Sequence, residues 1–296
     1  MWPGIFLKHR LLNPFSNSSA AMGAPKIEII ETGRFYADGG AMFGCIPKAS
    51  WTRRYPCNAD NACILAMRSM LVDDGDGRII LVDNGVGNKQ LRKLSFYKFF
   101  NLIDIGSELR LRGIAPTDVT DVVLTHLHFD HCGYTTQRGD DGRLSLSFPH
   151  ARHWITRSQW DTCMAPGPLE KASYLMENIE PLADSTMLRL ITHDVDISPA
   201  MHLKIAGGHV AGQIVVYAAD VDRTYVFAGD LIPLAAHISP DWLSAYDLYP
   251  LNSYNEKCRI LQEAVRLHQT LVYCHDAYLP CSEIKKIRGN IFSIVR

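Results

Sequence analysis

One short segment, residues 126–131, constrains this chain more than any other feature. It reads His126-Leu127-His128-Phe129-Asp130-His131, so four side chains that can bind a metal ion lie within six residues. A neutral imidazole binds a borderline metal ion through a ring nitrogen, and a carboxylate adds a hard anionic oxygen. Ligands spaced this closely leave no room for a packed core between them, so a purely structural role does not explain them. We therefore identify His126, His128, Asp130 and His131 as candidate metal ligands.

Composition allows a substantial hydrophobic core and argues against two classes of partner. The chain has 296 residues, 47% of them hydrophobic, and a formal net charge of -1. A nucleic-acid partner is not expected, because such proteins carry a basic excess or a basic stripe. The longest basic cluster, Lys285 and Lys286 with Arg288, is interpreted as the solvated face of a terminal helix. A membrane span is not expected either, because no run of 18 apolar residues occurs.

Residues 1–25 are expected to form an irregular extension. Residues 1–27 contain no acidic side chain and include a Ser-Asn-Ser-Ser run, as some transit peptides do. One arginine and three prolines fit that pattern poorly, so an extension, or a start upstream of a natural Met22, is the better interpretation. Eight cysteines without paired spacing indicate free thiols in a reducing compartment. A cytoplasmic location is therefore expected.

Residues 26–296 are expected to form one layered domain. Runs rich in Val, Ile and aromatic residues predict strands, and apolar residues at helical spacing predict helices. The predicted strands are 27–32, 62–72, 78–83, 119–125, 144–148, 153–156, 187–192, 202–206, 214–219, 224–228 and 270–274. The predicted helices are 88–112, 157–164, 168–180 and 253–268. This mixture indicates an α/β or α+β domain with sheet inside and helices outside.

Three further candidate ligands directly follow predicted strands. His209 follows strand 202–206, Asp230 follows strand 224–228, and His275 follows strand 270–274. A strand end is rigid and can aim a side chain at a fixed point. Each residue alone is more simply a cap or a satisfied core histidine. Their common placement, in a chain that also contains segment 126–131, favours a shared metal site.

The ordered set of these motifs resembles the metallo-β-lactamase superfamily. Segment 125–131, then Gly208-His209, Gly229-Asp230 and His275, occur in the order typical of that family. The resemblance covers roughly residues 26–296 and implies an α+β fold, the four-layer αββα sandwich. Asp83 is similar to a further family motif, an aspartate at a strand end that supports the metal ligands from behind.

The resemblance also implies a dinuclear metal centre. Its two ligand groups would be His126, His128 and His209 for one ion, and Asp130, His131 and His275 for the other, with Asp230 as the bridge. Nitrogen and oxygen donors favour zinc and also accept iron, manganese or cobalt. Two divalent ions, two carboxylates and a shared hydroxide leave a charge of about +1, which suits an anionic transition state. Asp130 and Asp230 are thus the candidate catalytic residues.

No cysteine is expected to bind a metal. Cys274 precedes His275, and neighbouring side chains on an extended strand face opposite ways. Cys274 should therefore point away if His275 points toward the metals. Candidate pocket residues are His237, Phe129, Met42 and Phe43, and the apolar ones predict a fairly hydrophobic small-molecule substrate.

Within the superfamily, the chain most resembles methyl-parathion-hydrolase-like enzymes and N-acyl-homoserine lactonases. The run 229–233 and the glycine-rich segment 39–44 resemble the former, in which the N-terminal segment helps to form the pocket and a dimer. A homodimer is therefore an expectation. Lactonases of the quorum-quenching type carry a tyrosine where Pro233 stands, so a lactonase activity would need another donor.

The function implied is a dinuclear metal-dependent hydrolase of a lactone or related ester, with promiscuous phosphotriesterase activity as a further expectation. Two alternatives remain open. One is a mononuclear-iron oxidoreductase similar to persulfide dioxygenases, against which the complete set Asp130, His131 and His275 argues. The other is a small-molecule-binding protein with negligible turnover, which the sequence does not exclude.

Overall fold

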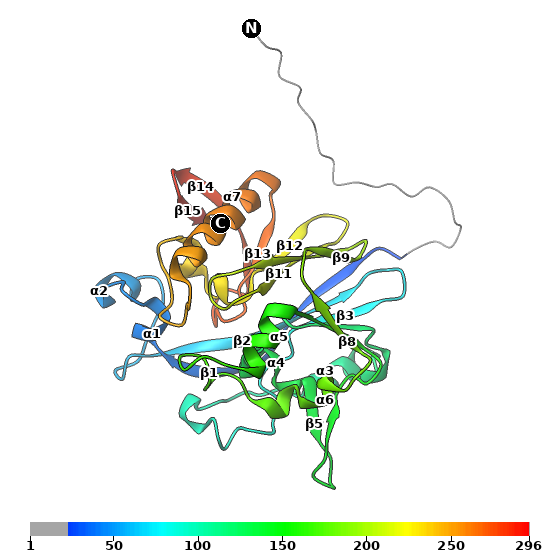
Figure 1. The fold of residues 1–296 in the computed structure, drawn as a ribbon. Helices are drawn as coiled ribbons and strands as arrows, with labels where there is room; N and C mark the ends of the chain where they lie inside the picture. The colour runs from blue at the N-terminus through cyan, green and yellow to red at the C-terminus, as the bar shows by residue number, and fades with distance from the viewer. Residues whose placement is uncertain (1–22, 296) are drawn as a thin grey trace.

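Residues 23–295 are described by the computed structural model, and their strands pair into two mixed sheets (Figure 1). The first sheet has the strand order β1 (Lys26–Asp38), β2 (Ala62–Asp73), β3 (Ile79–Val82), β4 (Asp121–Val123), β7 (Arg152–Thr156) and β8 (Leu188–Ile191). The second has the order β15 (Ile291–Ile294), β14 (Cys281–Arg288), β13 (Thr270–Val272), β12 (Thr224–Phe227), β11 (Gln213–Ala219), β10 (Met201–Ala206) and β9 (Val195–Ser198). A separate hairpin is formed by β5 (Thr136–Arg138) and β6 (Leu144–Leu146).

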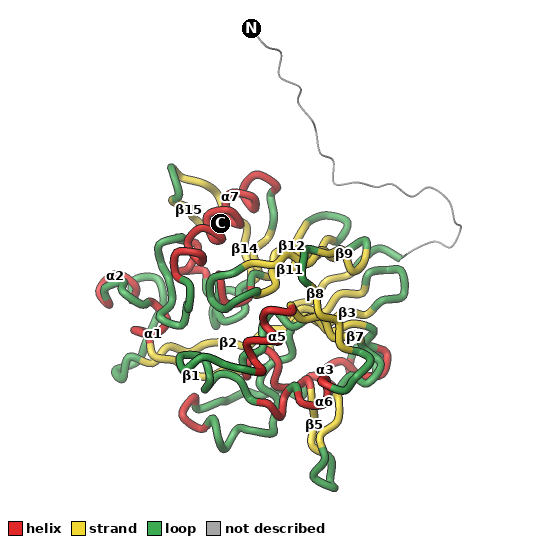
Figure 2. Tube along the Cα trace, in the orientation of Figure 1, coloured by secondary structure: helices red, strands yellow, loops and turns green. Residues whose placement is uncertain are grey.

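Helices cover the outer faces of both sheets (Figures 1 and 2). On the first sheet lie α3 (Ile105–Leu111), α5 (Arg157–Met164) and α6 (Glu180–Ala183), and on the second lies α7 (Pro250–Leu267). Short helices α1 (Gly39–Phe43), α2 (Lys48–Trp51) and α4 (Phe129–Cys132) lie in the connections near the ends of the strands. This is the predicted four-layer αββα sandwich, the fold of the metallo-β-lactamases.

The sandwich forms because the central strands carry apolar side chains on both of their faces. Val72 and Val82 of the first sheet pack with Leu203 and Val216 of the second in the layer between the sheets. The residues next to them in each strand point to the other face of the sheet, toward the helices. In α7, Ile260, Leu261 and Ala264 recur at helical spacing and bury one stripe against the second sheet. The central strands of each sheet are thereby removed from water on both faces.

Strand direction explains why the candidate ligands meet at one edge. β10 and β12 both run antiparallel to β11, and β13 runs parallel to β12, so these three strands end on the same side. In the first sheet, β3 and β4 are parallel and also share an edge. The backbone NH of Ile214 donates to the carbonyl of Thr125 at 2.8 Å, which fastens the two sheets together beside segment 126–131.

Several predicted elements differ from the structure. Helices 157–164 and 253–268 are confirmed, but helix 88–112 is wrong: only a 3₁₀ turn at Ser95–Tyr97 and α3 are helical. Lys98 and Asn101 between them have φ values of 47° and 51°, which a helix does not tolerate. Helix 168–180 is also wrong, since that stretch is mostly turns with a 3₁₀ turn at Met176–Asn178.

The basic cluster does not lie on a helix. Lys285 and Lys286 belong to strand β14, which pairs with β13 and β15. Its single buried residue, Ile284, gives too weak a period to predict a strand. The short strands β5, β9 and β15 were not predicted for the same reason. None of the helices among residues 23–295 is long and apolar enough to cross a membrane. Residues 1–22, most of the expected extension, lie outside the described residues.

Candidate metal centre

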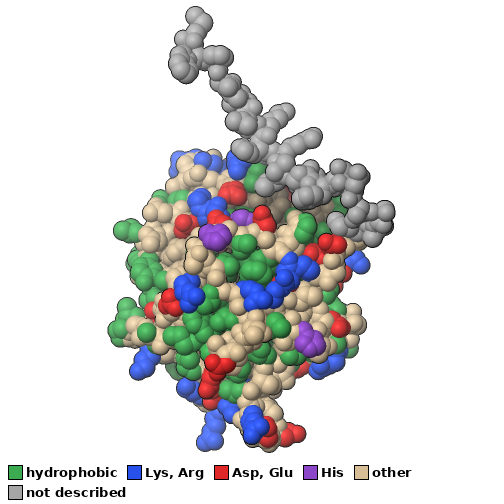
Figure 3. Space-filling view, turned by 45° about the vertical axis from the view of Figure 1, so that its right-hand side comes forward, with side chains coloured by type: hydrophobic (Ala, Val, Ile, Leu, Met, Phe, Trp, Pro, Cys, Tyr) green, Lys and Arg blue, Asp and Glu red, His purple; other side chains and the backbone are tan. Residues whose placement is uncertain are grey.

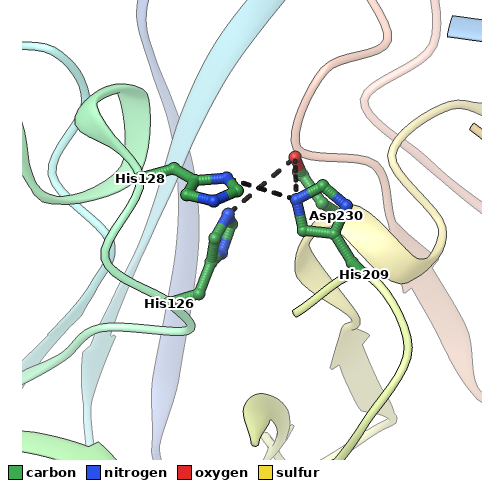
Figure 4. Close-up of side chains that lie close together, drawn as sticks. All are labelled: His126, His128, His209 and Asp230. Atoms are coloured by element: carbon green, nitrogen blue, oxygen red, sulfur yellow. Dashed lines mark hydrogen bonds and ion pairs between the residues drawn. The ribbon is translucent and has the colours of Figure 1, made fainter. Parts of the chain in front are cut away.

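Two groups of His and Asp side chains meet at the edge where the strands end. One group comprises His126, His128, His209 and Asp230, and the other comprises Asp130, His131 and His275; within each group the candidate ligand atoms lie within 4.8 Å of one another. In Figure 4, His126 and His128 point from one loop toward His209 and Asp230 on the opposite side. The structure therefore brings together all seven residues that the sequence singled out.

Local structure explains how segment 126–131 presents four candidate ligands to the site. Leu127 is buried in the core beneath the first sheet, and its backbone NH donates to Oε1 of Gln159 at 3.0 Å. The chain then turns into α4, where the NH of His131 donates to the carbonyl of His128 at 3.0 Å. Leu127 thus anchors the backbone in the core, and the turn into α4 brings His128, Asp130 and His131 to the same site.

Asp230 lies between the two groups. Its Oδ1 is 3.2 Å from Nε2 of His131 and 3.0 Å from Nε2 of His275. Its Oδ2 is 3.4 Å from Nε2 of His209 and 3.9 Å from Nε2 of His126. Each carboxylate oxygen therefore faces a different group, as a bridging ligand requires. Gly229 makes this turn possible, since its φ is 51° and a Cβ there would lie 2.7 Å from Nε2 of Gln213.

Hydrogen bonds on the far side of each ring determine which histidine nitrogens are free. Nδ1 of His131 donates to Oδ2 of Asp83 at 2.7 Å, and Nδ1 of His275 donates to the carbonyl of Ala66 at 2.7 Å. Thr125 Oγ1 donates to Asp83 at 2.8 Å and so accepts from Nδ1 of His126 at 3.1 Å. In the neutral rings, the Nε2 atoms of these histidines carry lone pairs that face the site.

The arrangement of these lone pairs fits metal ions. The Nε2 atoms of His131 and His275 are 3.2 Å apart, and Nδ1 of His128 lies 3.3 Å from Nε2 of His209. Facing lone pairs repel unless a cation lies between them. Two nitrogens bound to one tetrahedral zinc at about 2.0–2.1 Å would lie roughly 3.3 Å apart. Nε2 of His126 is also buried without a hydrogen-bond partner among the described residues, so the donor set matches the implied metals.

The pKa shifts of the candidate histidine ligands also fit bound metal ions. Burial, together with the neighbouring imidazoles, lowers the pKa of His126 and His128 well below the ordinary range, so both rings are neutral and able to bind a metal. Burial would also lower the pKa of His131, but the charges of Asp230, Asp130 and Asp83 raise it well above its ordinary value. This half of the site therefore attracts positive charge, which a divalent ion would supply in place of a proton.

A cavity of about 60 Å³ opens onto the site. Its apolar walls are formed by Phe35, Ala37, Met42, Leu65 and Phe129, and its polar lining consists of Tyr97, Ser173 and Tyr246 with the candidate ligands His128, Asp130, His209, Asp230 and His275. Two predicted pocket residues, Phe43 and His237, do not line it. Nε2 of His237 donates to the carbonyl of Met42 at 2.9 Å and its ring stacks on Phe43, so both residues support the wall from behind.

The expectation for Cys274 is wrong. Its thiol points toward the site and donates to Oδ1 of Asp230 at 3.3 Å. The alternation rule fails here because β13 ends at Val272, and the backbone after it is no longer a regular strand. Burial and the charge of Asp230 raise the pKa of the Cys274 thiol well above its ordinary value. Cys274 therefore acts as a hydrogen-bond donor to the carboxylate between the two groups.

Asp83 contacts the candidate ligand His131, and a second carboxylate that the sequence did not identify makes a similar contact. Asp83 accepts hydrogen bonds from the backbone NH and hydroxyl of Thr125 as well as from His131. On the other side of the site, Oδ1 of Asp247 accepts from Nδ1 of His209 at 3.2 Å. Asp247 lies in an irregular loop far along the chain from His209, so no spacing in the sequence identifies it.

Comparison with known proteins agrees with the fold. The metallo-beta-lactamase superfamily model matches residues 68–134, a range that contains Asp83 and segment 126–131. A probable metal-dependent hydrolase from Staphylococcus aureus is 27% identical with a TM-score of 0.80, over 89% of this chain and 94% of that one. Part of the chain thus matches the metallo-beta-lactamase superfamily model, and the whole fold is similar to that of a probable metal-dependent hydrolase.

Two more distant structures share the fold. Hydrolase AbOPH, of the beta lactamase superfamily, is 19% identical with a TM-score of 0.75, over 94% of this chain and 95% of that one. AidC, a dizinc quorum-quenching lactonase seen in complex with the product N-hexnoyl-L-homoserine, is 18% identical with a TM-score of 0.71, over 93% and 95% of the two chains.

Proposed function

We propose that this chain is a metal-dependent hydrolase that cleaves an uncharged lactone or related ester. The observation that carries the proposal is the position of Asp230, whose two oxygens face separate histidine groups at the floor of a largely apolar cavity. The similar S. aureus structure is a probable metal-dependent hydrolase, and the fold is shared with a dizinc lactonase. Both findings support a hydrolase over the iron oxidoreductase alternative.

The proposed ligands are those of the two groups. One ion would be held by His126, His128 and His209, the other by Asp130, His131 and His275, with Asp230 shared; zinc suits these donors best. When bound, two divalent ions supply Lewis acidity and a nucleophilic water at neutral pH. The protein contributes a rigid, buried frame that holds the free ring nitrogens in place before the ions bind.

Asp130 is the residue proposed to move a proton. It lines the cavity, and its Oδ2 lies 3.4 Å from Nε2 of His275 and 3.9 Å from Nε2 of His131. A carboxylate so placed can orient the attacking water, accept its proton and pass that proton to the leaving oxygen. Apolar side chains form part of the wall around it, and a less polar surrounding strengthens each electrostatic contact with the reacting atoms.

The cavity lining determines which substrates fit. None of the described residues that line it is a lysine or arginine, so away from the proposed metal ions no positively charged side chain is available to pair with an anionic group of a substrate. Apolar walls favour an alkyl or aromatic group beside the scissile bond. A neutral phosphotriester would also be compatible with these walls, and we propose it as a secondary substrate class.

Surface charge is consistent with a small-molecule substrate. On the face shown in Figure 3, lysine and arginine side chains are interspersed with acidic and apolar ones. A polyanion such as RNA binds most readily to a continuous basic stripe. The cavity is therefore a better candidate for substrate binding than the surface shown there.

One preparation of purified protein can test the proposal. We expect elemental analysis to find close to two divalent ions per chain and chelation to abolish turnover. A panel of matched neutral and anionic esters, lactones and phosphotriesters should show hydrolysis confined to neutral compounds. An Asp230→Ala variant with full activity would overturn the proposal. Iron as the sole metal, with oxygen uptake on persulfides, would instead establish the oxidoreductase alternative.

A further inference from the structure

The two halves of the candidate metal centre each have a carboxylate behind one histidine. Asp83 holds Nδ1 of His131 at 2.7 Å in one half, and Asp247 holds Nδ1 of His209 at 3.2 Å in the other. The side chains of His209 and Asp247 are both only 3% exposed. A buried carboxylate that accepts from Nδ1 fixes the ring orientation and leaves the lone pair on Nε2.

The backbone around Asp247 is fastened directly to His209. The NH of Leu248 donates to the carbonyl of His209 at 3.0 Å, and the NH of Tyr249 donates to the carbonyl of Gly208 at 2.9 Å. Earlier in the same loop, which comprises residues 239–249, the NH of Ala245 donates to the carbonyl of Ala41 at 2.8 Å. The carboxylate therefore reaches His209 from a segment whose position does not depend on that single contact.

A buried cation lies near this carboxylate. Lys257 of α7 is 1% exposed, and its Nζ donates to the carbonyl of Trp242 at 2.5 Å. Among the charged groups around it, Asp247 stabilises its ammonium most, ahead of Asp241 and Cys258. Lys257 thus both ties down the start of the loop and places positive charge near Asp247, so an ionised carboxylate is tolerated in a buried position.

We propose that Asp247 is the positioning residue for His209 and that it controls the affinity of the ion held by His126, His128 and His209. By the same geometry, Asp83 serves the ion on the other side. The inference rests on the metal centre proposed above, but not on the reaction assigned to it. Loss of a carboxylate behind a metal-binding histidine typically lowers metal affinity roughly 10- to 100-fold.

The test compares stepwise metal affinities in wild type, Asp247→Ala, Asp247→Asn and Asp241→Asn by competition with a chelator. Asp241→Asn is the matched control, because Asp241 is exposed, lies on the same loop and loses the same charge. We expect Asp247→Ala to weaken one ion roughly 10- to 100-fold and leave the other unchanged. Asp247→Asn should have an intermediate effect, since its amide oxygen can still accept from Nδ1, and the control should behave as wild type.

A spectroscopic measurement keeps the inference testable if the alanine variant folds poorly. Nitrogen chemical shifts of the metal-free protein should show His209 protonated at Nδ1 in the wild type and a mixture of tautomers in Asp247→Asn. Unchanged affinities and an unchanged tautomer would overturn the inference, as would equal weakening of both ions. A wild type that binds no metal would overturn the proposed function instead, and the tautomer would still decide the role of Asp247.

Discussion

Oδ2 of Asp83 lies 2.7 Å from Nδ1 of His131, and the same carboxylate holds the backbone NH and hydroxyl of Thr125. One buried side chain thus orients a candidate ligand and anchors the start of the segment that carries the other ligands. Its own backbone has a φ of 52°, a conformation that aspartate and asparagine adopt more readily than most residues.

We expect Asp83→Asn to affect mainly metal affinity and Asp83→Ala to lower stability as well. Asparagine tolerates the backbone conformation and keeps hydrogen-bonding groups, so it should lower metal affinity roughly 10- to 100-fold with a small loss of stability. Alanine also loses the contacts to Thr125 and adds backbone strain of about 1–2 kcal/mol, so its melting temperature should fall further. Elemental analysis and thermal unfolding check both. Wild-type metal content in either variant would contradict this prediction.

Tyr246 is expected to bind a substrate oxygen. It lines the cavity, and none of the described residues forms a hydrogen bond with its hydroxyl. Burial together with nearby charges, including Asp130 and Asp230, raises the pKa of Tyr246 to about 12. It is thus a neutral donor in the cavity, and Pro233 has no such group to offer. Tyr246→Phe should lower kcat/KM roughly 100-fold with metal content unchanged. Steady-state kinetics on the best substrate of the panel measures this effect.

Tyr97 provides the matched comparison for that variant. It also lines the cavity, but its ring packs on Phe129 at 5.0 Å, and of the charged groups only Asp130 contributes to its raised pKa. Tyr97→Phe should therefore cause a smaller loss than Tyr246→Phe. If Tyr97→Phe is the more damaging change, the substrate oxygen lies on the other side of the cavity and the assignment to Tyr246 is wrong.

Lys257 is expected to make stability depend on alkaline pH. Burial lowers its pKa from 10.5 to about 8. Below about pH 8 the lysine is charged in both states, and burying that charge destabilises the folded protein. Between about pH 8 and 10.5 only the unfolded chain binds the proton, so the free energy of unfolding rises with pH.

Replacement by an uncharged residue of similar length should remove this contribution. Relative to Lys257→Met, the wild type should gain up to roughly 3 kcal/mol in free energy of unfolding across the window from pH 8 to 10.5. Denaturant unfolding of both proteins at several pH values measures the difference, and other titrating groups cancel in the comparison. A difference that does not vary with pH would show that Lys257 keeps an ordinary pKa.

The sequence located candidate ligands where they directly follow a regular strand. His209 and Asp230 follow short strands whose apolar runs are visible in the sequence, and those strands have the predicted positions within a few residues. A strand end defines both the place and the direction of the next side chain. The αββα fold itself came from the resemblance, because strand patterns alone do not specify how two sheets stack.

Prediction failed where the backbone leaves regular geometry. Cys274 points into the site because β13 ends two residues before it, and strand ends are the least certain feature of a periodic pattern. Asp247 and Tyr97 reach the site from a loop and a 3₁₀ turn, whose positions depend on tertiary contacts rather than on local spacing. Lys285 and Lys286 lie on a strand held by its neighbours, which its own sequence does not indicate.

Cys274 allows a final prediction about the kind of metal ligand used. Its thiol lies 3.3 Å from Oδ1 of Asp230, close enough that Asp230, Cys274 and His275 form a third group with ligand spacing. A buried thiol with a raised pKa is a poor metal ligand, because the thiolate is the binding form. The cobalt-substituted protein should therefore lack a sulfur-to-metal charge-transfer band.

Cys274→Ser keeps a donor to Asp230 and should retain metal content. Cys274→Ala loses that donor and should lose about 0.5–1.5 kcal/mol of stability. A charge-transfer band that disappears in Cys274→Ser would instead make the thiol a metal ligand.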